Sequence, residues 1–280
     1  MTDAAADLEL DALLATIYER YHSDFRGYAR ASLRRRAASG MAQVGASSVP
    51  HLRQLIATDP RAFAVLLPWF TIQVSDLFRD PTYFHYFRTE IVPWLRTYPS
   101  RKLWVAGCST GEEAYSFAII LAEEGLLDRT LIYATDIYAA SLRAAEAGIF
   151  GLDRMRTFSE NHQKSGASTS LSSWYTTGPH GAVFDRALRE RIVFADHSLA
   201  TDHVFAEVQV VSCRNVMIYF GAELQDRALR LFHDSLSRQG WLGLGPKETI
   251  DFSQQRDHFA PHPERWYQMR DLTESRSDAR

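Results

Sequence analysis

The sequence predicts an α/β protein that begins with a small all-helical domain and continues as a doubly wound sheet domain with an inserted antiparallel β-sheet. Helical patterns fill the first part of the chain, a strand, a glycine turn and a helix follow one another over residues 102–124, and short apolar runs recur beyond them. We expect the helical domain over 1–95, the sheet domain over 96–280, the insertion over 151–190 and a polar tail over 272–280.

Composition narrows the class of protein. The chain has 280 residues, 46% of them hydrophobic, and a formal net charge of -3, so its overall charge does not indicate a nucleic-acid binder. The two cysteines, Cys108 and Cys213, are too few for a disulfide scaffold and form no C-x-x-C pair for zinc, so we expect no metal. The sequence starts with an acidic amphipathic segment in place of a signal peptide, and it has no apolar run of about 18 residues. We therefore expect a cytoplasmic protein that does not enter the membrane, with a monomer as its state.

The helical domain has one apolar stripe and one basic stretch. The stripe has helical spacing and consists of Leu10, Leu13, Leu14, Ile17 and Tyr21. No Asp or Glu occurs between Arg26 and Thr58, and the spacing of Arg26, Arg30 and Arg34 places all three on one helix face. This face is either merely solvated or a docking surface for an acidic partner. Nucleic acid is less favoured, because few aromatic residues lie among the arginines.

One arginine stands in an aromatic setting before the sheet domain. Arg79 lies between Phe78 and Asp80, and a new helix begins at Pro81. Its guanidinium is either a structural partner of a neighbouring carboxylate, Asp76 or Asp80, or the anchor of a ligand.

The turn of the strand–turn–helix unit does not suit phosphate. It contains Gly107 and Gly111, whereas a pyrophosphate-binding turn has three glycines or a following lysine. Two carboxylates, Glu112 and Glu113, follow at once; they suit a helix N-terminus and would repel phosphate. They would attract an ammonium or a sulfonium group, and S-adenosylmethionine carries both without a phosphate. The alternative is an ordinary turn with acidic capping residues.

A second acidic residue strengthens the cofactor reading. The apolar run of residues 130–135 predicts the next strand, and Asp136 follows it. A carboxylate at the end of the second strand of such a domain commonly binds the ribose hydroxyls of a nucleoside. Asp136 is also a candidate N-cap for the helix expected over 138–147, and the two roles are compatible.

The remaining elements are read from turns and apolar runs. Serines mark a loose polar stretch between residues 159 and 173. The pairs 174–175 and 183–184, which are aromatic or apolar, then flank a hairpin-like turn over 176–181. This insertion either accepts a peptide along a sheet edge or is a plain surface excursion. Core strands are expected over 191–194 and 207–213, followed by a helix from Ala222 to Arg238 that Gly240 terminates; the last strands are expected over 241–245 and 266–270.

Five segments together resemble the chemotaxis receptor glutamate methyltransferases of the CheR type. They are LFRD (77–80), WVAGCSTGEEAYS (104–116), ATDI (134–137), CRNVMIYF (213–220) and GWLGLGPKE (240–248). The resemblance covers roughly residues 20 to 270. It implies a helical N-terminal domain before a Rossmann-like, S-adenosylmethionine-dependent methyltransferase domain with a small inserted sheet.

The resemblance also assigns roles to matching positions. It implies that Glu112 faces the amino end of the donor, that Asp136 binds its ribose, and that Arg79 and Tyr219 are catalytic. The positions expected to bind S-adenosylmethionine, or its product S-adenosylhomocysteine, are Gln73, Ser75, Arg79, Gly107, Glu112, Asp136, Ser198, Leu199, Arg214 and Asn215. Gln73 and Ser198 stand where the family usually has Asn, and Pro246-Lys247 replaces His-Ser of its G-H-S-E motif.

The implied reaction is methylation of glutamate side chains in the Glu-rich helices of a chemoreceptor, which Arg26, Arg30 and Arg34 would dock. No general base is required, because a Glu carboxylate is already ionised near neutral pH. Two alternatives remain: a methyltransferase of the same build acting on a soluble signalling protein or a small molecule, and a non-catalytic module that binds S-adenosylmethionine.

Overall fold

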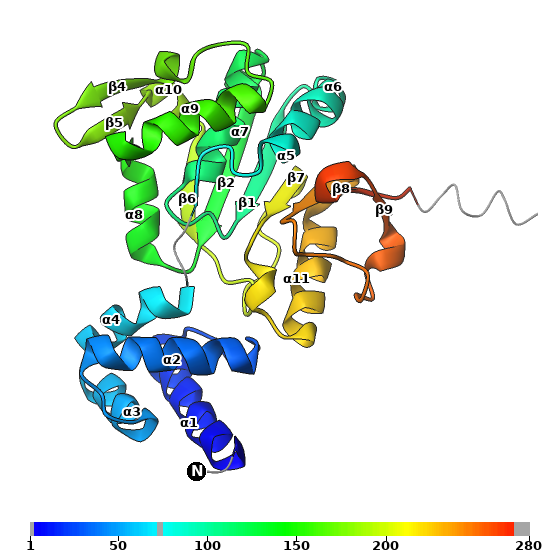
Figure 1. Ribbon diagram of the computed structural model, residues 1–280. Helices are drawn as coiled ribbons and strands as arrows, with labels where there is room; N and C mark the ends of the chain where they lie inside the picture. The colour runs from blue at the N-terminus through cyan, green and yellow to red at the C-terminus, as the bar shows by residue number, and fades with distance from the viewer. Residues whose placement is uncertain (1–2, 72–74, 272–280) are drawn as a thin grey trace, which may run out of the picture. The chain divides into compact units, whose positions relative to one another are not determined.

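The computed structural model describes residues 3–71 and 75–271, which fall into two compact units (Figure 1). Unit 1 consists of the N-terminal residues up to 73 together with two later segments, 198–202 and 219–228. Unit 2 contains the rest of the chain and the whole sheet. Residues 75–95, grouped with the helical part in the sequence analysis, lie in unit 2.

The N-terminal part of unit 1 is all-helical, as the sequence predicts. Its helices are α1 (Asp3–Tyr21), α2 (Arg30–Val44), α3 (Val49–Thr58) and α4 (Pro60–Thr71). The predicted apolar stripe of α1 is buried from Leu10 to Ile17. The Ser48 side chain accepts the backbone N–H of His51 at 3.2 Å and so caps α3, which has a proline in its first turn.

Unit 2 is built on a seven-stranded sheet with the strand order β6-β2-β1-β7-β8-β10-β9. The five strands from β6 to β8 pair in parallel, and β10 and β9 close the sheet antiparallel. The strands are β1 (Arg101–Ala106), β2 (Thr130–Asp136), β6 (Ile192–Asp196), β7 (Val208–Cys213), β8 (Leu236–Leu244), β9 (Phe259–Pro261) and β10 (Trp266–Met269). Every residue of β7 is buried, as in the middle of a doubly wound sheet.

The helices of unit 2 either precede β1 or connect successive parallel strands (Figure 1). They are α5 (Pro81–Tyr86), α6 (Val92–Leu95), α7 (Glu112–Glu123), α8 (Ala139–Ala147), α9 (Met155–Lys164) and α10 (Arg186–Arg189), and α11 (Ala222–Ser235) runs from one unit into the other. A π-helical segment, Phe87–Ile91, joins α5 to α6. The strand order reverses at β1, whose neighbours are β2 on one side and β7 on the other. In such sheets ligands bind outside the carboxyl ends of the strands at this reversal.

The expected small antiparallel sheet is present, but only two of its three strands lie within the predicted insertion, since the first precedes residue 151. Its strand order is β3-β5-β4, with bounds Ile149–Phe150, Gly181–Phe184 and Tyr175–Gly178. The expectation of a loose polar stretch was wrong at its start, where α9 forms. Met155, Phe158 and His162 recur at helical spacing and are buried, so one apolar face stabilises this helix despite its polar composition.

The end of the last helix also differs from the expectation. α11 ends at Ser235, and Gly240 lies inside β8 instead of terminating the helix. Leu236 already pairs with Val208 of β7, and the register then shifts before Trp241 pairs with Val210. Gln239 adopts a φ of 57°, typical of a bulge that takes up the extra residues. No helix among the described residues is long and apolar enough to cross a membrane.

Candidate active site

The turn after β1 is fixed to the end of β2. The backbone N–H groups of Gly107 and Cys108 both donate to the Thr135 carbonyl, at 2.8 and 2.9 Å. Gly107 has a φ of 73°, and a Cβ there would come within 2.3 Å of a Val216 methyl. Gly111 has a φ of 93°, and its Cβ would lie 2.8 Å from Cβ of Ala145. Both positions therefore require glycine for conformation and for space.

Asp136 is bound to the same turn. One carboxylate oxygen accepts the backbone N–H of Ser109 at 2.8 Å, and the other accepts that of Tyr138 at 2.9 Å. Its side chain is largely buried, and this burial raises its pKa, while the backbone N–H groups oppose that shift. The predicted capping role of Asp136 was wrong, because the N-cap of α8 is Tyr138 and, among the described residues, no side chain caps this helix. The bond to Ser109 places the carboxylate beside the glycine turn.

Glu112 begins α7 and is completely buried. The Thr110 hydroxyl lies 2.9 and 2.7 Å from its two carboxylate oxygens, and Nη1 of Arg154 donates to Oε1 at 2.8 Å. Arg154 also donates to the Ser75 carbonyl and, at 2.9 Å, to the Asp76 carboxylate. The insertion therefore contributes a cation that the sequence analysis did not foresee.

Glu113, the second carboxylate of the pair, has a different environment. It accepts the Ser212 hydroxyl at 2.6 Å and Nη1 of Arg214 at 3.1 Å. Each carboxylate of the pair thus has an arginine partner inside the protein: Arg214, which also pairs with Asp80, for Glu113, and Arg154, which also pairs with Asp76, for Glu112. Glu112 and Glu113 are consecutive in a helix, so their side chains leave α7 about 100° apart.

Arg214 joins this cluster to the segment that carries Arg79. Its Nη2 donates to the Asp80 carboxylate at 2.7 Å and to the backbone carbonyl of Arg79 at 2.8 Å, and its guanidinium lies 4.1 Å from the centre of the Tyr83 ring. The Tyr83 hydroxyl lies 2.6 Å from that of Ser212, and burial, followed by the charge of Glu113, raises the pKa of Tyr83 well above its ordinary value. Asp76 and Asp80 thus pair with Arg154 and Arg214.

A hollow of about 240 Å³ opens beside Arg214. Its lining is mixed in charge and consists of Asp80, Tyr83, Arg214, Leu244, Pro246, Glu264 and Arg265. Glu264 and Arg265 both have left-handed φ values, 58° and 61°, and the Thr82 hydroxyl donates to the Glu264 carboxylate at 2.6 Å. Consecutive left-handed residues other than glycine are uncommon and tend to occur at functional sites.

The loop that starts at Asn215 is organised by Glu248. Its buried carboxylate accepts backbone N–H groups from Asn215 at 2.9 Å, Val216 at 3.0 Å, Ile218 at 3.3 Å and Gly245 at 2.6 Å. Burial raises the pKa of Glu248, and these four donors oppose that shift. In the sequence Glu248 is only the last residue of a motif, and no pattern there predicts this role.

Tyr219, Ser198 and Leu199, expected at the donor or acceptor site, belong to unit 1. The Tyr219 carbonyl accepts the backbone N–H of Ala29 at 2.8 Å, and the Arg36 guanidinium lies 4.0 Å from the centre of the Tyr219 ring. Ser198 donates its backbone N–H to Asp202 at 2.9 Å, and Leu199 is buried. Gln73 lies outside the described residues.

The basic face differs from the expectation in two respects. Arg26 precedes α2, which begins at Arg30, so one helix does not carry all three arginines. Each of them pairs with an aspartate: Arg26 with Asp24 at 2.8 Å, Arg30 with Asp11, and Arg34 with Asp7 at 2.6 Å. The stretch has no acidic residue in sequence, but α1 and the preceding turn supply them in space. All three arginine side chains stay between 37% and 49% exposed.

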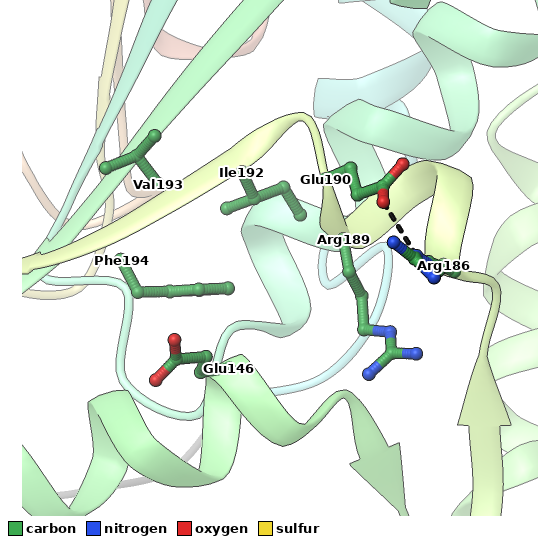
Figure 2. A pocket seen from close by; sticks show the side chains of 7 residues that line it. All are labelled: Glu146, Arg186, Arg189, Glu190, Ile192, Val193 and Phe194. Carbon is green, nitrogen blue, oxygen red and sulfur yellow. Dashed lines mark hydrogen bonds and ion pairs between the residues drawn. The ribbon is translucent and has the colours of Figure 1, made fainter.

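A separate hollow of about 380 Å³ lies beside the insertion, between α8, α10 and β6 (Figure 2). Arg186 and Glu190, which line this hollow, form an ion pair. The side chains of Arg189 from α10 and Phe194 from β6 also line it (Figure 2). None of the residues expected to bind the donor lines this hollow.

The structure therefore brings Gly107, Glu112 and Asp136 together around one turn. In unit 2, Arg214 bonds Glu113 and the backbone carbonyl of Arg79, and the backbone of Asn215 is held by Glu248. The groups around the glycine turn suit a nucleoside with a cationic end, because they are carboxylates rather than lysines. The described residues contain no group of three or more His, Cys, Asp or Glu side chains that could hold a metal ion.

The chain is similar to known proteins over most of its length. Residues 73–268 match the family described as CheR methyltransferase, SAM binding domain, and residues 8–70 match its all-alpha domain. A Pseudomonas putida protein that carries the name methyltransferase Cher3 is 51% identical over 255 residues, which cover 91% of this chain and 93% of that protein. A chemotaxis protein methyltransferase of Listeria innocua is 30% identical over 248 residues, covering 87% of this chain and 92% of that protein.

Proposed function

Because this chain belongs to the CheR methyltransferase family, whose cofactor is S-adenosylmethionine, we propose that it methylates glutamate side chains of a chemoreceptor-type protein in chemosensory adaptation. The observation that carries the proposal is the position of Glu112 and Asp136. Both carboxylates bind residues of the turn after β1, through Thr110 and Ser109, where the strand order of the sheet reverses.

In this proposal Asp136 accepts the ribose hydroxyls, and Glu112 accepts the α-ammonium group of the donor. Gly107 and Gly111 have no side chains, so the ligand would contact the backbone of this turn directly. Ser75, Ser198 and Leu199 complete the proposed contacts, together with Gln73. When bound, the sulfonium supplies an activated methyl group, so the chain has to supply position, exclusion of water and a site for the acceptor carboxylate.

The acceptor side is assigned to Arg79 and Tyr219. A glutamate is ionised at neutral pH, since its ordinary pKa is about 4.3, so it needs no base to become a nucleophile. As its oxygen forms a bond to the methyl carbon, the bond from that carbon to sulfur breaks, and no proton moves. Arg79 holds one carboxylate oxygen while the other reacts, and Tyr219 orients the acceptor. Arg214 and Asn215 hold the segments around them.

The proposed partner is a Glu-rich helical region of a receptor in the cytoplasm, approached by a monomer of this chain. Arg26, Arg30 and Arg34 remain partly exposed although each pairs with an aspartate, and exposed guanidinium groups attract such a region over about a Debye length. Their aspartate partners lower the net charge of this face, which suits a contact that must form and dissociate repeatedly.

The proposal is tested with methyl-labelled S-adenosylmethionine and the cytoplasmic fragment of a chemoreceptor. We expect label on the fragment that base releases as methanol, as a carboxyl methyl ester requires. Fragments with the acceptor glutamates changed to Ala should take up none. Label that resists base, or binding of the cofactor without transfer to any receptor fragment, would contradict the proposal and favour another acceptor.

A further inference from the structure

The cation next to Glu112 comes from the insertion. Arg154 ends the 3-10 turn Leu152–Arg154 that leads into α9, and its guanidinium lies 4.6 Å from the centre of the Phe158 ring one turn later. Its Nη1 donates to Glu112 and its Nη2 to Asp76, at 2.8 and 2.9 Å. The side chain remains 34% exposed, whereas that of Glu112 is fully covered.

This arrangement restricts how a ligand can reach Glu112. Within the described residues, Arg154 is the one cation that lies within ion-pair distance of Glu112. A ligand ammonium that binds Glu112 must therefore share its carboxylate with Arg154 or displace the guanidinium. Displacement alone is unfavourable, because it removes an arginine from Glu112, Asp76 and the Ser75 carbonyl at once.

Sharing is favoured by the charges of the cluster. Glu112 and Asp76 carry two negative charges against the single positive charge of Arg154, so the cluster can accept one more cation. The amino-acid end of S-adenosylmethionine has an ammonium and a carboxylate on the same carbon atom. Glu112 and Arg154 lie 2.8 Å apart, and Arg154 is partly exposed. Glu112 can therefore contact the ammonium while Arg154 contacts the carboxylate beside it.

We propose that Arg154 binds the α-carboxylate of the donor while Glu112 binds its α-ammonium, so that one ion pair recognises the zwitterionic end. This inference rests on the donor site proposed above and assigns it a residue from the insertion. Helix α9, which follows Arg154, packs against the segment that carries Arg79. The Asn161 amide donates to the Leu77 carbonyl at 3.2 Å, and the centres of the His162 and Phe78 rings lie 4.7 Å apart.

The test compares two ligands that differ only at this end. S-adenosylhomocysteine keeps the amino acid, and 5′-deoxy-5′-methylthioadenosine has the same nucleoside and sulfur without it. Calorimetric titrations of both are made with the wild type, Arg154→Gln and Arg154→Lys. Loss of a charged hydrogen-bond pair should lower the affinity for S-adenosylhomocysteine by roughly 10- to 100-fold in Arg154→Gln and by less in Arg154→Lys. The affinity for methylthioadenosine should change by less than about twofold in either variant.

Equal losses for both ligands would show that Arg154 only positions the turn, and unchanged binding of S-adenosylhomocysteine would also overturn the proposal. The exposed Arg156→Gln variant is the matched control, since Arg156 contacts Glu160 on the surface of the same helix. Arg154→Lys keeps a charge beside Glu112 and serves if Arg154→Gln fails to fold. A wild type that binds neither ligand would instead refute the donor site itself, and this inference with it.

Discussion

The carboxylate of Glu248 accepts the backbone N–H of Asn215 at 2.9 Å, across 33 positions of sequence. Asn215 has a φ of 60°, a left-handed conformation that needs support from its surroundings. Three further N–H groups converge on the same carboxylate, so one buried side chain fixes both the loop after β7 and the end of β8. The loop that follows Arg214 is thus held by a residue from the segment after β8.

Replacing Glu248 with Gln should therefore destabilise unit 2. The amide NH₂ cannot accept, so at least one of the four N–H groups loses its partner inside the protein. We expect a loss of about 2–3 kcal/mol in the free energy of unfolding, measured by urea denaturation. Glu146→Gln, at an exposed carboxylate, is the control and should change stability by less than about 0.5 kcal/mol. Equal stability of both variants would show that Glu248 does not hold the loop.

Truncation of Arg79 should separate catalysis from donor binding. Arg79→Ala keeps the backbone carbonyl that accepts from Arg214, so the local fold should persist. If Arg79 holds the acceptor carboxylate, turnover should fall by roughly 100-fold or more, while the affinity for S-adenosylhomocysteine changes by less than about threefold. The comparison of single-turnover rates with calorimetric affinities decides this. Equal losses in both quantities would identify Arg79 as a cofactor or structural residue.

Changes to the three arginines and to their aspartate partners should shift the KM for a receptor fragment in opposite directions. Reversal of Arg26, Arg30 and Arg34 to Glu should raise the KM for a receptor fragment roughly tenfold and weaken its dependence on salt, as expected for about 1.4 kcal/mol of lost attraction. Neutralising their partners in Asp7→Asn/Asp11→Asn should lower that KM. Steady-state kinetics at 20 and 300 mM salt measure both effects. A KM insensitive to all these changes would leave the face as a solvated surface.

A buried ionic cluster on α7 predicts the acid stability of unit 2. Glu123 is buried and accepts from His162 at 3.1 Å, from Thr169 and from Arg88. Burial works against its charge, but these donors outweigh it and lower the pKa of Glu123 from 4.5 to about 2. A lowered carboxyl pKa stabilises the folded state above the unfolded value, so this contribution should disappear as the pH falls from about 4.5 to about 2.

Glu123→Gln should therefore be less stable than the wild type at pH 7, and the difference should shrink as the pH falls through that window. Thermal unfolding followed between pH 7 and 3 measures it. The control is Glu160→Gln, whose carboxylate forms an exposed pair with Arg156 and should contribute less than about 0.5 kcal/mol. A constant difference between the wild type and Glu123→Gln at all pH values would contradict the assignment.

Local patterns in the sequence were sufficient for the main elements. The run from Leu103 to Ala106 and the helix from Glu112 formed as predicted, because strand, turn and helix are short-range features. The same holds for the place of Asp136 next to the turn, since parallel strands bring their carboxyl ends to one edge. The helix at α9 was missed because its composition is mostly polar and only three of its residues, at helical spacing, are buried.

The partners of charged residues could not be predicted, because they come from distant parts of the chain. Arg154 lies 42 positions from Glu112, and Asp7 lies 27 positions before Arg34; no periodic pattern marks either pair. Glu113 showed the same limit, since its neutralisation by Arg214 depends on two strands being adjacent in the sheet. The charges in the sequence therefore led to predictions of ligand contacts, but they did not show which charges are paired within the protein.

The central claim is that Glu112 and Asp136 form a site for a cationic nucleoside that lacks phosphate, and calorimetry tests it most directly. Titration of the purified chain with S-adenosylhomocysteine should show binding at one site, Asp136→Asn should weaken it by roughly 10- to 100-fold, and ATP should not bind there. Absence of binding to the wild type, or uptake of ATP as strong as that of S-adenosylhomocysteine, would contradict the account.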